Sequence, residues 1–233
     1  MNKPKLITMY GSPWSERVRW ALAFKGLPYE KENYEPGIDE EKIKKLTGQA
    51  LVPVLITDGR IIPDSTAILE WLEAAKPEPP LLPTSDKDRA QVSLWEEVAI
   101  GVLGPQARTL ISGRLLRSSH PEMQKAGEYF GGKYGHSAYA EDQAKLTVKR
   151  LLLSLKQTLS GRQYLVGDAF TRADLTTASM LMLLKPAPDG MFFLPAPERP
   201  IYTEPVADDS AFSPVFAWRD QMYKKHRGEA VKP

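Results

Sequence analysis

Residues 10–22, YGSPWSERVRWAL, join a strand to a helix through a tight turn, and this turn decides the fold. The stretch up to Tyr10, KLITMY, has the apolar and β-branched character of a short strand. Gly11 permits a tight turn. Ser12 is typical of a helix N-cap, and Pro13 suits the first helical position because its missing backbone N–H has no partner there. The sequence therefore predicts a strand, a turn and a helix capped by Ser12.

The residues that follow have a helical period. Apolar side chains recur at spacings of three and four, at Trp14, Val18, Ala21 and Leu22. This pattern predicts a buried stripe, with Glu16, Arg19 and Lys25 on the opposite, solvated side of the helix. Arg17 and Arg19 are candidates to attract an anionic ligand.

The rest of the first third alternates between strand and helix patterns. The predicted elements are a strand over 29–34, a helix over 40–46, a strand over 51–57, a strand over 60–62 and a helix over 63–72. Asp58-Gly59 is a strong signal for a two-residue hairpin. A proline at the start of a strand-like run belongs at its end or edge, and we expect the Val52-Pro53 bond to be cis. The order of elements predicts an α/β domain.

A proline-rich break separates this part from a helical remainder. Residues 77–88 begin with PEPPLLP, which cannot continue a helix, so they are the predicted linker between a domain over 1–76 and a domain over 89–233. Apolar residues then recur at helical spacing, first at Val92, Trp95, Ala99 and Val102 and again at Ala144, Val148, Leu151 and Leu155. Residues 118–139 support no assignment. The second domain is predicted to be all helical.

Its last third carries two further signals. Thr171 and Asp174 have the spacing of a capping box, which fixes the start of a helix. Residues 185–213 hold too many prolines for regular structure, and we expect them either to roof an acceptor-substrate pocket or to cover a dimer surface. Ser213-Pro214 repeats the cap pattern of Ser12-Pro13 and predicts a final helix.

The composition excludes several classes of function. The chain has 233 residues, of which 42% are hydrophobic, enough for two compact domains. Its 31 basic and 29 acidic residues, without a long block of either sign, favour neither nucleic acid nor a membrane as a partner. Neither a signal-peptide pattern nor a membrane-spanning run is present, so a cytoplasmic protein is expected. The absence of cysteine means that any thiol chemistry uses an external thiol. His120, His136 and His226 are too scattered for a metal motif and are expected to be solvated, so no metal is expected.

Both predicted domains resemble those of the glutathione transferases. The matching pieces are the SPWSERVRWAL turn and helix, the Val52-Pro53 pair, the Asp64-Ser65 helix start, and Thr171-x-x-Asp174 after a Gly-Asp turn. The resemblance is closest to the serine-type members, with the theta, zeta and tau classes all open. It implies a thioredoxin-like N-terminal domain that binds glutathione, an all-α C-terminal domain that selects the acceptor, and a homodimer.

This resemblance places the sulfur of bound glutathione at the N-terminus of the first helix. A free thiol has a pKa near 8.5 and the thiolate is the nucleophile, so a donor that stabilises the anion raises the reactive fraction. The Ser12 hydroxyl is the candidate catalytic donor, and the helix N-terminus adds a partial positive charge. Two alternatives stay open: Ser12 is only an N-cap, or Ser15, about one helical turn further on, is the donor.

The same resemblance assigns the positions that hold the peptide. Val52 would offer its backbone N–H and C=O to the cysteinyl backbone, as a strand does. Asp64 would bind the ammonium group and Ser65 the carboxylate of the γ-glutamyl end, with plain helix capping as the alternative for both. Gln49, or else Lys45, is expected to contact the glycyl carboxylate. The candidate glutathione-binding residues are thus Val52, Pro53, Asp64, Ser65 and Gln49.

The function that this resemblance implies is a glutathione transferase, which adds the thiolate to a small, largely apolar electrophile in detoxification. One alternative is a glutathione-dependent isomerase, with Arg108 and Arg114 as basic residues of its acceptor pocket. The other is a non-enzymatic interaction protein that reuses the fold. Trp95, Met180 and Met182 either line an apolar acceptor pocket or pack in the core, and core packing is favoured.

Overall fold

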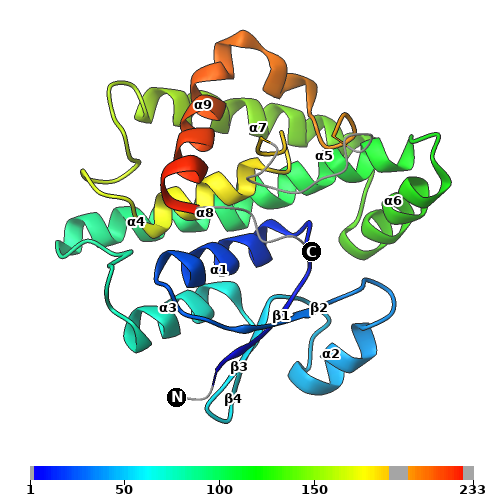
Figure 1. Cartoon of the computed structure of the whole chain (residues 1–233). Helices are drawn as coiled ribbons and strands as arrows, with labels where there is room; N and C mark the ends of the chain where they lie inside the picture. The colour runs from blue at the N-terminus through cyan, green and yellow to red at the C-terminus, as the bar shows by residue number, and fades with distance from the viewer. Residues whose placement is uncertain (1–2, 189–198, 228–233) are drawn as a thin grey trace. The chain divides into compact units, whose positions relative to one another are not determined.

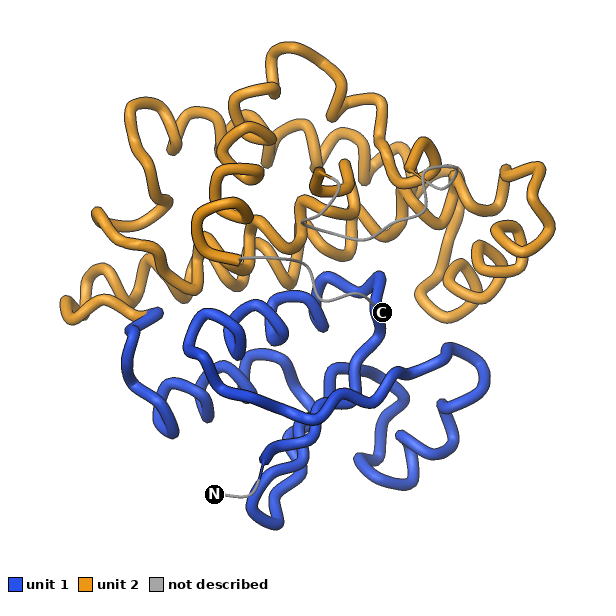
Figure 2. The backbone as a smooth tube through the Cα atoms, viewed as in Figure 1, with its two compact units in different colours: residues 1–81, 233 blue, residues 82–232 orange. Residues whose placement is uncertain are grey.

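The computed structural model describes residues 3–188 and 199–227. The chain divides into two compact units, residues 1–81 and 82–232 (Figure 2). The helices within the described ranges all lack the combination of length and apolar character that crossing a membrane requires.

Unit 1 is built on a four-stranded mixed sheet in the order β2-β1-β3-β4 (Figure 1). Its strands are β1 (Lys5–Thr8), β2 (Glu30–Asn33), β3 (Val54–Thr57) and β4 (Arg60–Ile62). β1 runs parallel to β2 and antiparallel to β3, which pairs with β4 across the Asp58-Gly59 turn. Both turn residues have positive φ, 44° and 75°, as the hairpin signal predicted.

Helices pack on both faces of this sheet. Neighbouring side chains of a strand point to opposite faces, and Ile7 and Val54 form a cluster with Ile43 of α2 (Glu40–Thr47). On the other side lie α1 (Pro13–Phe24) and α3 (Ser65–Ala75), which pack against each other (Figure 1). The end of β1, the start of α1 and the start of α3 therefore all belong to unit 1.

The predicted solvated face of α1 is wrong, because its charged residues are buried. Glu16, Arg19 and Lys25 are only 2%, 4% and 1% exposed. Each has a partner of opposite charge: Arg19 Nη2 lies 2.8 Å from Glu16 Oε2, and Lys25 Nζ lies 2.9 Å from Glu73 Oε1 of α3. Burial of a charge is tolerated only when it is paired and hydrogen-bonded, so helical spacing alone misassigned this face.

Unit 2 is helical. Its first helix, α4 (Asp86–Val98), begins inside the segment predicted as linker, where Ser85 Oγ accepts a bond from the Asp88 N–H at 3.3 Å. It continues through a π-helical turn, Ala99–Leu103, into α5 (Gly104–Leu116). Pro105 has no N–H to bond the preceding turn, which explains the local change in helical register.

Four further α-helices follow in the described part of unit 2, and one of them, α8, packs against α4, α5 and α9. They are α6 (Pro121–Tyr134), α7 (Ala138–Thr158), α8 (Arg172–Leu181) and α9 (Ser213–Met222). α6 fills the segment to which the sequence assigned no structure, and it packs closely on α5: a Cβ on Gly127 would lie 2.5 Å from the Leu116 nitrogen. Every residue of α8 is buried, and the predicted Thr171–Asp174 capping box at its start is confirmed. The predicted fold class, an α/β first domain followed by an all-helical one, is therefore confirmed.

The proline-rich segment before α9 differs from its prediction in two ways. It contains short 3₁₀ helices, Pro205–Asp208 and Ser210–Phe212, whereas Pro195 and Pro197 lie outside the described residues. Ser213 is not a cap: its backbone is already helical and no side-chain cap bond forms. The incoming 3₁₀ turn places the chain in a helical conformation one residue earlier than the Ser-Pro pattern implies.

Candidate functional site

The turn between β1 and α1 presents Ser12 at the N-terminus of the helix. Its backbone is extended, with φ −85° and ψ 124°, and its Oγ accepts a bond from the Ser15 N–H at 3.3 Å. Its carbonyl oxygen accepts the first helical bond, from the Glu16 N–H at 2.9 Å. The cap uses a lone pair of the hydroxyl oxygen, so the hydroxyl hydrogen can still be donated to a ligand.

Ser15 has a different environment. Its Oγ accepts a bond from the Met9 N–H at 3.2 Å, which ties the end of β1 to the first turn of α1. Ser15 is 0% exposed, whereas Ser12 keeps 5% of its surface exposed. Ser12 is thus the more exposed of the two serines.

The N-terminus of α3 holds the second group of predicted residues. Asp64 caps the helix, with Oδ1 accepting from the Ala67 N–H at 2.8 Å, and the residue is exposed. Ser65 is 5% exposed, and its Oγ accepts a bond from Arg17 Nη1 at 3.1 Å. The same Nη1 donates to Thr66 Oγ1, also at 3.1 Å.

Arg17 therefore links the starts of the two helices. It is 0% exposed, and its Nη1 is engaged by the hydroxyls of Ser65 and Thr66. A buried guanidinium that donates to Ser65 Oγ leaves the hydroxyl hydrogen of that serine to be donated elsewhere. The sequence did not predict that Thr66 would accept a hydrogen bond from Arg17. The only feature of the sequence that points to Thr66 is its position directly after the predicted cap.

The Val52-Pro53 segment lies directly before β3, and its peptide bond is cis, as predicted. Gln49 connects this segment to the start of α3. Its Nε2 donates to the carbonyl oxygens of Leu51 and Pro63, both at 3.2 Å. Because both amide hydrogens are used within the chain, a contact with a glycyl carboxylate requires one of these bonds to be exchanged. Lys45, the alternative, is exposed on α2.

The arginines proposed for an acceptor pocket are engaged within unit 2. Arg114 donates from Nε to the Ile201 carbonyl oxygen at 2.6 Å and pairs with Glu204. Burial lowers the pKa of Arg114 to about 10. The guanidinium of Arg108 stacks on Tyr134, 3.6 Å from the ring centroid, and burial lowers its pKa too. Arg114 thus anchors the segment that precedes α9, which the sequence did not foresee.

Two of the three apolar candidates belong to the core. Met180 and Met182 are 0% and 3% exposed, which confirms the favoured interpretation. Trp95 is only half-buried and lines a small hollow together with Leu103 and Thr177.

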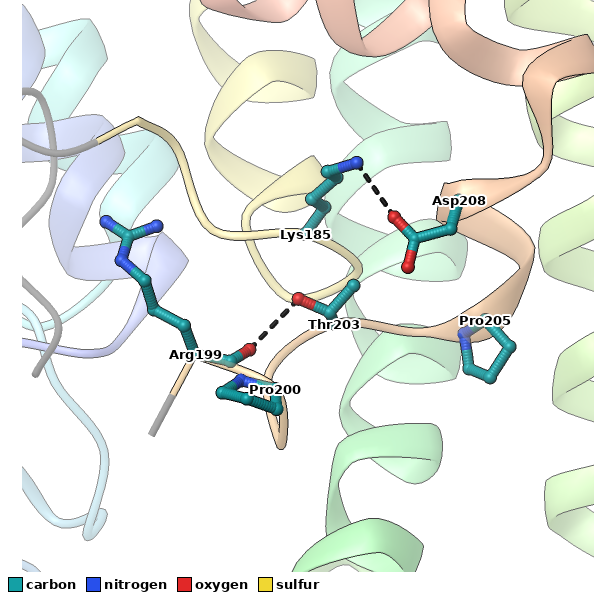
Figure 3. Close-up of a pocket in the computed structure, with 6 residues that line it drawn as sticks. All are labelled: Lys185, Arg199, Pro200, Thr203, Pro205 and Asp208. Atoms are coloured by element: carbon teal, nitrogen blue, oxygen red, sulfur yellow. Dashed lines mark hydrogen bonds and ion pairs between the residues drawn. The ribbon is translucent and has the colours of Figure 1, made fainter. Parts of the chain in front are cut away.

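An open hollow of about 590 Å³ lies within unit 2 and is lined by residues of the proline-rich segment (Figure 3). Its lining residues are Lys185, Arg199, Pro200, Thr203, Pro205 and Asp208. Lys185 Nζ lies 2.9 Å from Asp208 Oδ1, and Thr203 Oγ1 donates to the Arg199 carbonyl oxygen at 2.9 Å. The Asp208 carboxylate thus neutralises Lys185, and the guanidinium of Arg199 donates to the Ala187 carbonyl oxygen from both Nη atoms at 3.1 Å.

Two of the three histidines are packed rather than solvated, contrary to prediction. The His226 ring stacks on Phe170 with centroids 4.1 Å apart, and its Nε2 lies 3.2 Å from the Tyr164 hydroxyl. Burial lowers the pKa of His226 to about 4. His136 Nε2 lies 3.2 Å from Glu141 Oε2. In the ranges that the structure describes, no three His, Asp or Glu side chains gather in a way that would hold a metal ion.

Comparison with known proteins identifies the family. Residues 6–80 match the family model for the glutathione S-transferase N-terminal domain, and residues 119–188 match that for the C-terminal domain. A probable maleylacetoacetate isomerase of Caenorhabditis elegans is 33% identical over 182 residues, which cover 77% of this chain and 78% of the relative. A probable glutathione S-transferase of Solanum tuberosum is 36% identical over 187 residues, covering 79% and 74%.

A solved structure shares the fold along the whole chain. It is a glutathione S-transferase of Methylobacterium radiotolerans in complex with glutathione sulfonate, with a TM-score of 0.68 at 23% identity over 100% of this chain and 98% of that one. The chain belongs to the glutathione S-transferase family and is an enzyme of that type. The predicted superfamily is confirmed.

Proposed function

We propose that this enzyme binds glutathione along unit 1 and that the Ser12 hydroxyl donates a hydrogen bond to its thiolate. One observation carries the proposal: Ser12 caps a helix of 12 residues with its lone pair and keeps its hydroxyl hydrogen for a ligand. Ser15 is the weaker candidate because it is fully buried and bonded to the backbone of Met9.

The electrostatics of this site favour an anion. The N-terminus of a helix carries roughly half a positive charge, and its first N–H groups lack intrahelical partners. A hydrogen bond to a charged group contributes about 1.5–3 kcal/mol, and about 1.4 kcal/mol corresponds to one pKa unit. Together, the hydroxyl and the helix end are sufficient to bring a thiol pKa from near 8.5 to neutrality.

The γ-glutamyl end of the peptide is proposed to bind at the start of α3. The Ser65 hydroxyl, held by Arg17, would donate to the carboxylate, and Asp64 would pair with the ammonium group through the oxygen that does not cap the helix. Val52 and Pro53 would pair with the cysteinyl backbone. Gln49 is proposed mainly to keep these two segments together, since it bonds the carbonyl groups of Leu51 and Pro63.

The thiolate would attack a small, largely apolar electrophile, forming a carbon–sulfur bond as the electrophile releases its leaving group or takes up a proton. The second candidate is a glutathione-dependent isomerase, in which the thiolate adds to an unsaturated acid and is later expelled. The 33% identity to a probable maleylacetoacetate isomerase favours it. We further propose a homodimer that acts in cytoplasmic detoxification, on the basis of family membership.

Ultraviolet absorbance of the thiolate, recorded for glutathione bound to the protein across a pH series, tests the proposal. We expect a thiol pKa below that of free glutathione. Binding without this depression would reject thiolate activation, and no binding would support the interaction-protein alternative. Steady-state assays with an aryl halide and with an unsaturated cis-diacid would then separate the transferase from the isomerase.

A further inference from the structure

We propose that the buried Glu16–Arg19 pair is the device that positions Ser12 for the thiolate, so that Arg19 is a positioning residue of the reaction. This role presupposes the thiolate site proposed above. It is carried by the contacts that the Arg19 side chain makes within the chain.

The guanidinium of Arg19 is saturated with hydrogen bonds. Nε and Nη2 donate to Glu16 Oε2 at 3.0 and 2.8 Å. Nη1 donates to Thr8 Oγ1 at 2.8 Å and to the Met9 carbonyl oxygen at 3.1 Å, and Nη2 also donates to the Tyr10 carbonyl oxygen at 2.9 Å. A guanidinium has five N–H groups, and these contacts account for all of them.

These contacts fix the chain directly before the turn that contains Ser12. Met9 and Tyr10 are followed at once by Gly11 and Ser12, and the guanidinium also lies 5.7 Å from the centroid of the Tyr10 ring. A Cβ on Gly11 would have no atom within 4 Å, so there is open space on that side of the residue. Arg19 therefore anchors the incoming strand to the same helix that Ser12 caps, and the planar fork fixes direction as well as distance.

The pair also sets the charge near the helix N-terminus. Glu16 lies in the first turn of α1 and is 2% exposed. An unpaired carboxylate there would oppose a thiolate at the same helix end, because like charges disfavour each other's ionised form. Because Arg19 neutralises Glu16, the partial positive charge of the helix N-terminus acts on the thiolate without repulsion from this carboxylate.

The chain provides a matched control in Lys25, at the other end of α1. Lys25 is 1% exposed, pairs with Glu73 and donates to three carbonyl oxygens, those of Lys76, Pro77 and Pro79, at 2.8–3.0 Å. Like Arg19, it is buried, ion-paired and hydrogen-bonded to backbone carbonyl oxygens, but it holds the end of α3 instead of the turn that contains Ser12. Loss of either residue should destabilise the unit, and only loss of Arg19 should alter the thiol.

The experiment compares the thiol pKa of bound glutathione and the melting temperature in wild type, Arg19→Gln, Glu16→Gln and Lys25→Met. We expect Arg19→Gln to raise the thiol pKa by about one unit, which is about a tenfold loss of thiolate at low pH. Glu16→Gln keeps the three bonds from Arg19 to the turn and should leave the thiol pKa at or below its wild-type value. Lys25→Met should lower the melting temperature alone.

Arg19→Lys serves if Arg19→Gln fails to fold, because it keeps the charge with fewer donors; its thiol pKa should rise by a smaller amount. A depressed wild-type thiol pKa that is unchanged in the Arg19 variants, or that rises equally in Lys25→Met, would overturn the positioning role alone. A wild-type protein without a depressed thiol pKa would overturn the proposed function, and the positioning role with it.

Discussion

Replacing Ser12 with alanine separates its two roles, helix cap and thiolate donor. The cap is one bond, from the Ser15 N–H to Ser12 Oγ at 3.3 Å, and loss of an N-cap side chain costs about 1 kcal/mol. For a chain of this size, that corresponds to a fall of roughly 2–4 °C in the melting temperature. Stability should therefore change little.

The effect on the bound thiol should be larger. A hydrogen bond to a charged group contributes about 1.5–3 kcal/mol, so its loss should raise the thiol pKa by about one to two units. At a pH below both pKa values the thiolate fraction, and with it kcat/KM, should fall by about tenfold to a hundredfold. The helix end remains, so the thiol pKa should not return fully to its value in free glutathione.

Thiolate absorbance against pH and thermal unfolding, measured on the same preparations, give both quantities. Ser15→Ala is the control: it leaves the Met9 N–H without its acceptor, which costs about 1–3 kcal/mol, and it should not change the thiol pKa. If Ser12→Ala lost only stability, the hydroxyl would be a cap and nothing more. If Ser15→Ala raised the thiol pKa instead, the donor would be Ser15 and the assignment to Ser12 would be wrong.

Three further predictions follow from the contacts described. Ser65→Ala should weaken glutathione binding about tenfold to a hundredfold by calorimetry, through loss of a charge-assisted bond; an unchanged Kd would limit Ser65 to capping. Hydrogen bonding from Arg117 lowers the pKa of Glu141 to about 2 from 4.5, so the stability that Glu141 contributes is complete above pH 4.5 and is lost toward pH 2. The melting temperature of Arg117→Gln should therefore depend less on pH over this range than that of the wild type. Burial raises the pKa of Asp174 to about 6 from 3.8, so its contribution to folding stability is complete below pH 3.8 and is lost as the pH rises through 6. Asp174→Asn should remove this fall in melting temperature with pH. If the fall persisted, another group would be its cause.

Several features of the site could be predicted from the sequence because they are set by neighbouring residues. A cap at Ser12 needs only a short polar side chain before a helix, and the hairpin needs only the positive φ of Asp58-Gly59. The Thr171–Asp174 capping box is likewise closed by two residues three positions apart. Each of these interactions forms within a few residues of chain, so the pattern of residue types is enough.

The same kind of pattern failed where residue types alone do not record how the chain enters a helix or which side chains become partners. Ser12-Pro13 and Ser213-Pro214 read alike, yet only Ser12 is a cap, because the chain enters the second helix from a 3₁₀ turn. The charged side chains of α1 read as a solvated face because helical spacing records polarity and contains no information about partners.

The sequence by itself thus determined the family, the order of strands and helices in the first domain, and the serine at the start of the first helix. The tertiary structure alone decided which charges are buried and what they hold. Arg17 reaches Ser65 across 48 positions of the chain, and Arg114 reaches the glutamate at position 204 across 90. The physical reason is desolvation: a charge can leave water only where folding supplies its partners, and residues far away in the sequence provide them.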